Sequence, residues 1–95
     1  LEFIEEAAAM DSLESLQAAV TADPQDLESR YALAVVQMVA GETEVSLQMC
    51  WGILRDDREF RDDIGRLTMI RIFDVLGKGN EMATKYRRKL FNAMH

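Results

Sequence analysis

Apolar residues recur along this 95-residue chain at intervals of three and four, the spacing that places them on one face of an α-helix. Intervals of two, which are typical of strands, do not dominate any segment. A single proline and five glycines interrupt the pattern. We therefore expect an all-α fold of five to six helices, arranged as antiparallel hairpins with short links.

The first clear helix is expected to begin after Asp11, which would cap it together with Glu14 three residues later. It would end at Asp23, because Pro24 cannot donate a hydrogen bond to a continuing helix. Proline suits the first position of a helix, so a second helix is expected from Pro24 to Ala40, with Asp23 as its cap.

Gly41 is placed for a left-handed cap, so the following helix should return antiparallel after a short link. The apolar positions of that returning helix lie between Val45 and Leu54. Its interior Gly52 predicts a close helix crossing, since glycine costs about 1 kcal/mol against alanine in a helix.

Two more helices are expected after the charged stretch 55–63. Asp62 and Asp63 suit the start of the first, whose apolar stripe would be Ile64, Leu67, Ile70, Phe73 and Leu76. The second would follow the loop 77–80, with an apolar stripe of Met82, Ala83, Tyr86, Leu90, Phe91 and Met94.

The composition excludes several kinds of chemistry. The net charge is −6, which disfavours general affinity for nucleic acid or an anionic membrane, and no apolar run has the ~18 to 20 residues of a membrane span. Cys50 and His95 are the only residues of their types, which removes intrachain disulfides and Cys/His zinc sites. We expect one domain over residues 1–95 without a cofactor or metal.

Catalysis is the weakest hypothesis. The acidic pairs Asp56-Asp57 and Asp62-Asp63 could in principle serve as acid and base, but adjacent residues on a helix point apart and several arginines lie beside them. Cys50 follows the helical spacing of its apolar neighbours, so we expect an inert, buried thiol rather than a reactive one. No catalytic residue is predicted.

One hairpin shows a repeat pattern between residues 26 and 58. Its features are Leu33-Ala34 at the small-residue contact, Gly41 at the turn, Ser46-Leu47 in the second helix and Ile53-Leu54 near its end. This segment resembles a tetratricopeptide unit of about 34 residues. It departs from the usual pattern at Arg30, Gln37 and Arg58.

The second half contains a more distinctive succession, namely Phe60-Arg61-Asp62-Asp63, Arg66, Phe73, Leu76-Gly77, Met82 and Tyr86-Arg87-Arg88-Lys89-Leu90. From about Met10 onward the chain resembles the C-terminal tetratricopeptide-like domain of bacterial thioredoxin-like proteins of the YbbN/CnoX type. The resemblance implies a cytoplasmic, non-enzymatic domain that binds chaperones such as a GroEL-type chaperonin and holds unfolded clients. It also implies that an N-terminal thioredoxin-like domain is missing from this fragment.

Two partner-binding surfaces are predicted. The first is on the last helix, at Tyr86, Arg87, Arg88, Lys89 and Leu90. Residues 78–95 hold five basic residues and one acidic residue, whereas residues 1–29 hold eight acidic residues and no basic one. This polarity favours an acidic partner for the basic end. The alternative is that these cations only stabilise the last helix by interacting with the negative end of its dipole.

The second predicted surface is an apolar groove lined by Tyr31, Val35 and Met38, where the resemblance places the ligand-binding face of the hairpin. Core packing is the alternative for these residues, because a short array has little groove. An exposed patch of methionines, including Met10, Met49, Met69 and Met94, is a further candidate. The alternative function is structural: docking onto the missing domain, or self-association through exposed ends of the array.

Overall fold

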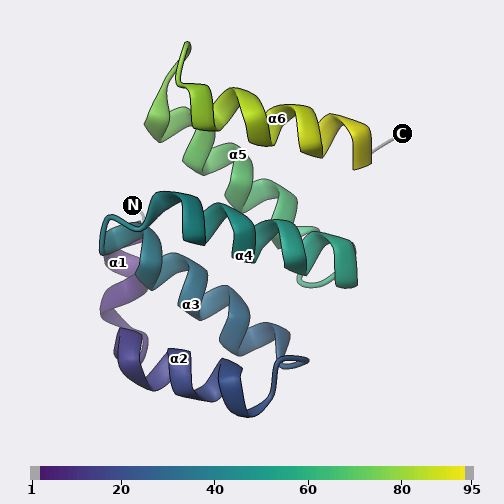
Figure 1. The fold of residues 1–95 in the computed structure, drawn as a ribbon. Coiled ribbons are helices and arrows are strands. Elements are labelled where there is room, and N and C mark those ends of the chain that lie inside the picture. The colour runs from purple at the N-terminus through teal and green to yellow at the C-terminus, as the bar shows by residue number, and fades with distance from the viewer. Residues whose placement is uncertain (1–2, 94–95) are drawn as a thin grey trace.

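The computed structural model describes residues 3–93, and the described chain is built from α-helices (Figure 1). In chain order these are α1 (Phe3–Ala8), α2 (Leu13–Ala22), α3 (Leu27–Val39), α4 (Thr43–Asp56), α5 (Ile64–Leu76) and α6 (Glu81–Ala93). No strand occurs within the described range. The predicted all-α class and the number of helices are confirmed.

Consecutive helices from α2 to α6 run antiparallel and stack into an elongated body of 33 × 24 × 20 Å (Figure 1). The α3–α4 hairpin lies in the middle of the stack, with α1 and α2 packed on α3 and with α5 and α6 packed on α4. α2 and α6 therefore form its two opposite ends (Figure 1).

Two predicted N-caps are displaced along the chain. The Ser12 hydroxyl, not Asp11, accepts the hydrogen bond from the Ser15 amide at 3.1 Å and begins α2. α3 begins at Leu27 rather than Pro24, because the Asp23 carboxylate accepts from the Gln25 amide and closes a turn around the proline.

Asp26 then caps α3. Its carboxylate accepts from both the amide and the hydroxyl of Ser29. These two hydrogen bonds lower the pKa of Asp26, the Ser29 hydroxyl contributing most.

The predicted turn after α3 is confirmed. Gly41 has a φ of +89°, and its amide donates to Met38 while the Glu42 amide donates to Gln37. These two bonds form a Schellman motif, which requires a left-handed residue at the glycine position. The motif reverses the chain within the three residues 40–42 and sets α4 antiparallel to α3.

The start of α5 differs from the expected acidic cap. Arg61, Asp62 and Asp63 are all left-handed, with φ between 49° and 68°. From this backbone conformation the Asp63 side chain does not accept from an amide of the helix, and instead pairs with the Arg66 guanidinium.

The apolar stripe predicted for α5 is partly wrong. Leu67 and Ile70 are 41% and 37% exposed, and the buried positions are Gly65, Thr68, Met69, Ile72 and Phe73. Gly65 explains the rotation: a Cβ there would lie 3.1 Å from the Cys50 carbonyl oxygen and from the Leu54 amide nitrogen. α5 therefore turns its glycine-bearing face, rather than the bulkier stripe, toward the backbone of α4.

The close helix crossing is thus at Gly65 and not at Gly52. A Cβ on Gly52 would meet the Arg30 guanidinium at 2.6 Å, so this glycine makes room for a side chain of α3. Arg30 is buried, donates to Asp56 at 2.7 Å, and donates a longer hydrogen bond to the Pro24 carbonyl at 3.4 Å.

Candidate protein-interaction surfaces

The orientation of α6 is fixed by its cap and by three buried side chains. The Asn80 side chain accepts from the Ala83 amide at 3.0 Å and begins the helix. Ala83, Tyr86 and Leu90 then point into the core at intervals of three and four. As a consequence the intervening cations Arg87, Arg88 and Lys89 are all exposed.

The prediction that Tyr86 and Leu90 contact a partner is therefore corrected. Tyr86 is only 1% exposed and Leu90 is equally part of the core, because both lie on the face that packs toward α4 and α5. The Tyr86 hydroxyl donates to the Glu44 carboxylate, which also accepts from the Lys85 ammonium at 3.1 Å. The hydrogen bond with Glu44 raises the pKa of Lys85.

An apolar area adjoins the exposed cations of α6. Phe91 is 63% exposed, and it lines a hollow of about 310 Å³ together with Ile70, Arg87 and other residues of α5 and α6. The Arg87 guanidinium lies 5.2 Å from the centre of the Phe73 ring. We call the exposed set Ile70, Arg87, Arg88 and Phe91 the α6 face.

The predicted groove residues are mostly in the core. Tyr31 and Val35 are buried, and Met38 is half-buried against the same core cluster. The core-packing alternative is correct for Tyr31 and Val35, since both belong to the core cluster and α1 packs on α3.

Contacts of Glu6 link α1 to both α3 and α5. Its carboxylate accepts from the Tyr31 hydroxyl at 3.2 Å and pairs with Arg71 at 3.3 Å. Arg71 also lies 4.1 Å from the centre of the Phe3 ring. Burial and the neighbouring Glu6 carboxylate raise the pKa of Tyr31.

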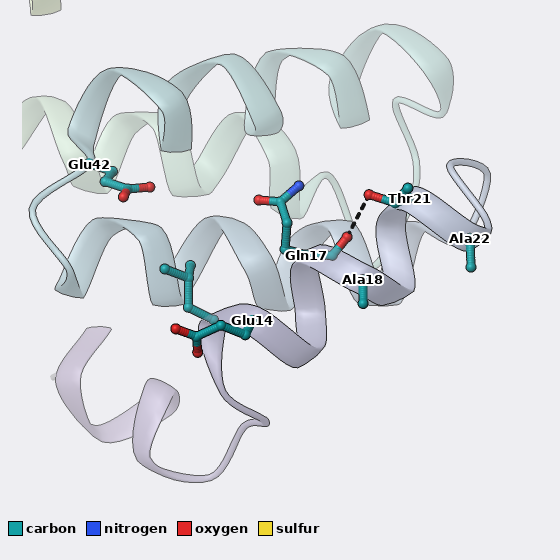
Figure 2. A pocket seen from close by; sticks show the side chains of 7 residues that line it. Glu14, Gln17, Ala18, Thr21, Ala22 and Glu42 are labelled. Carbon is teal, nitrogen blue, oxygen red and sulfur yellow. Dashed lines mark hydrogen bonds between the residues drawn. The ribbon is translucent and has the colours of Figure 1, made fainter.

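Sequence reasoning missed a second surface, which lies along α2. Figure 2 shows Glu42, from the link between α3 and α4, across from the side chains of α2. Between them is an open hollow of about 570 Å³, which we call the α2 groove, lined by Leu13, Glu14, Gln17, Ala18, Thr21, Ala22 and Glu42. The small residues Ala18 and Ala22, one helical turn apart, were the only local signal for it.

The other candidate groups are placed in structural roles. None of the described methionines is exposed: Met69 is buried and the others are half-buried. The predicted exposed methionine patch is therefore wrong for these residues. Met94 lies outside the described range. Cys50 is buried as expected, and burial raises the pKa of its thiol to about 12.

The acidic pairs make contacts with arginines. Asp56 pairs with Arg30, and Asp63 pairs with Arg66. Within residues 3–93, no group of three or more potential metal-ligating side chains comes together. No helix in that range has the length and apolarity to cross a bilayer.

A stack of antiparallel helical hairpins, each packed on the next, defines a helical repeat protein. The sequence model of the tetratricopeptide repeat matches residues 6–95, and the chain belongs to this family. No curated protein matches the chain. Tetratricopeptide repeats generally mediate protein–protein interaction and are typically non-catalytic.

Proposed function

We propose that this domain is a non-catalytic interaction module that binds an acidic protein surface through the α6 face. The observation that supports the proposal is the exposure of Arg87 and Arg88 beside an exposed aromatic ring, at the basic end of a protein of net charge −6. Aromatic and arginine side chains are the residues that most often dominate protein interfaces.

The resemblance in the second half of the sequence supports a more specific form of the proposal. Tyr86-Arg87-Arg88-Lys89-Leu90 belongs to the succession by which the chain resembles thioredoxin-like proteins, and that resemblance implies work with chaperones. We therefore propose a cytoplasmic co-chaperone role, with a GroEL-type chaperonin and unfolded clients as the partners, and without nucleic acid, membrane or cofactor. In this account Tyr86 and Leu90 hold the helix in place, while the cations contact the partner.

The test is binding of the chain to a GroEL-type chaperonin, measured by biolayer interferometry at two salt concentrations. The Arg87→Ala, Arg88→Ala variant should bind about tenfold more weakly, and added salt should weaken binding of the unmodified chain. The matched control is Arg55→Ala, Lys78→Ala, which removes two exposed cations outside α6 and should bind normally.

Two outcomes would count against the proposal. Equal binding by both double variants would remove the α6 cations from the interaction. If no variant and no unmodified chain bound the chaperonin, the partner itself would be wrong. Circular dichroism of each variant separates loss of contact from loss of fold.

A further inference from the structure

The α2 groove combines apolar lining residues with two acidic side chains. Leu13, Ala18 and Ala22 line it together with Glu14 and Glu42, and both glutamates are exposed. Neither glutamate forms an ion pair with another residue of the described chain. This end of the molecule belongs to an N-terminal region in which residues 1–29 hold eight acidic residues and no basic one.

The α6 face has the complementary arrangement. Phe91 projects from α6, and Arg87 and Arg88 precede it by four and three residues, so all three side chains share one side of the helix. Two cations thus flank an exposed aromatic ring, and two carboxylates line the α2 groove together with its apolar side chains. The two surfaces lie at opposite ends of the stack and cannot meet within one molecule (Figure 1).

We propose that the chain associates head to tail, with the α6 face of one copy seated in the α2 groove of a second copy. Phe91 would enter between α2 and the α3–α4 link, and the guanidinium groups of Arg87 and Arg88 would approach Glu14 and Glu42. The chemistry that selects this occupant is charge complementarity around an apolar contact, supplied by the two ends of the same chain.

This contact is heterologous, because it joins two different surfaces. Every open assembly then retains one unused α2 groove and one unused α6 face. The number of copies per assembly therefore rises with concentration and does not stop at two, unless the copies close into a ring. The α6 face is also the surface proposed for the chaperone partner. Self-association and partner binding would therefore compete, and the partner would keep the chain dispersed.

The experiment uses sedimentation velocity on two variants that each disable one surface. Ala18→Arg fills the groove and repels incoming arginines, while Phe91→Glu removes the ring. The unmodified chain should show a mass that rises with concentration, and each variant should weaken association by about tenfold or more. Mixed in equal amounts, the two variants should form a dimer and nothing larger, since only one pair of intact surfaces remains.

Matched controls keep the result specific. Ser15→Arg places the same cation on α2 outside the groove, and Val75→Glu replaces a residue of α5 that is 63% exposed, as Phe91 is. Both controls should associate as the unmodified chain does. A strictly monomeric unmodified chain would overturn the proposal, and so would self-association that survives in both single variants or a mixture that stays monomeric.

The groove variant also distinguishes this inference from the proposed function. Ala18→Arg leaves the α6 face intact, so chaperonin binding should persist while self-association is lost. A variant that lost chaperonin binding but still self-associated would show that the two activities use different surfaces. That result would contradict the inference that both use the α6 face.

Discussion

Arg30 shows how one residue replaces a usual feature of the repeat. The sequence places a cation where tetratricopeptide units commonly have an aromatic side chain, and the structure shows the buried guanidinium paired with Asp56. Gly52 leaves the space in which that guanidinium lies. The glycine and the arginine therefore form a unit that ties α3 to the end of α4.

This coupling predicts that the effect of Gly52→Ala on the free energy of unfolding changes sign when Arg30 is also replaced. In the unmodified chain the new Cβ would displace the Arg30 guanidinium from Asp56, which offsets the helix preference of alanine. In an Arg30→Ala background the same substitution should stabilise the fold by up to about 1 kcal/mol. Urea unfolding of the four proteins measures the coupling, and strict additivity of the two changes would contradict this account.

Cys50 predicts a loss of stability in alkali. Burial raises the pKa of the thiol from 9.0 to about 12, so the folded chain holds this proton more tightly than the unfolded chain. The resulting stabilisation is complete below the unfolded pKa and is lost as the pH rises from about 9 toward 12. The free energy of unfolding should fall across this window, and less steeply in Cys50→Ala.

Alkylation gives an independent measure of the same burial. At pH 8, iodoacetamide should modify Cys50 at least about a hundredfold more slowly in the folded chain than in urea, because reaction requires opening of the core. Fast alkylation under native conditions would show that the thiol is accessible.

At the scale of elements, helix existence was predictable and helix rotation was not. The spacing of apolar residues and the Gly41 turn predict the α3–α4 hairpin closely, because both signals are local. The spacing in α5 also fits a stripe through Leu67 and Ile70, which the structure leaves exposed. The face that packs is decided by the backbone contact at Gly65, a long-range property that the spacing does not contain.

Gly65→Ala should therefore destabilise the protein by about 1 to 3 kcal/mol, despite the higher helix preference of alanine. The neighbouring atoms are the backbone of α4 at Cys50 and Leu54, which cannot rotate away as a side chain can. The midpoint of urea unfolding provides the measurement. A variant as stable as the unmodified chain would mean that α4 and α5 are less tightly packed than described.

At the scale of the whole molecule, the charge pattern of the sequence correctly located the exposed cations but not the residues that support them. Arg87, Arg88 and Lys89 are exposed, whereas Tyr86 in the same motif is buried. The α2 groove was not predicted, because the spacing of Ala18 and Ala22 marks only its α2 side and Glu42 joins it from outside α2. A surface that is formed jointly by separate elements can be identified only once the packing of those elements is known.

We propose above that a partner contacts the α6 face rather than the groove predicted at Tyr31, Val35 and Met38. Hydroxyl-radical footprinting of the chain with and without a GroEL-type chaperonin, at a concentration where the chain is monomeric, compares Phe91 with Met38 directly. We predict that the partner slows oxidation of Phe91 and leaves Met38 unchanged. Protection of Met38 with no change at Phe91 would contradict the account.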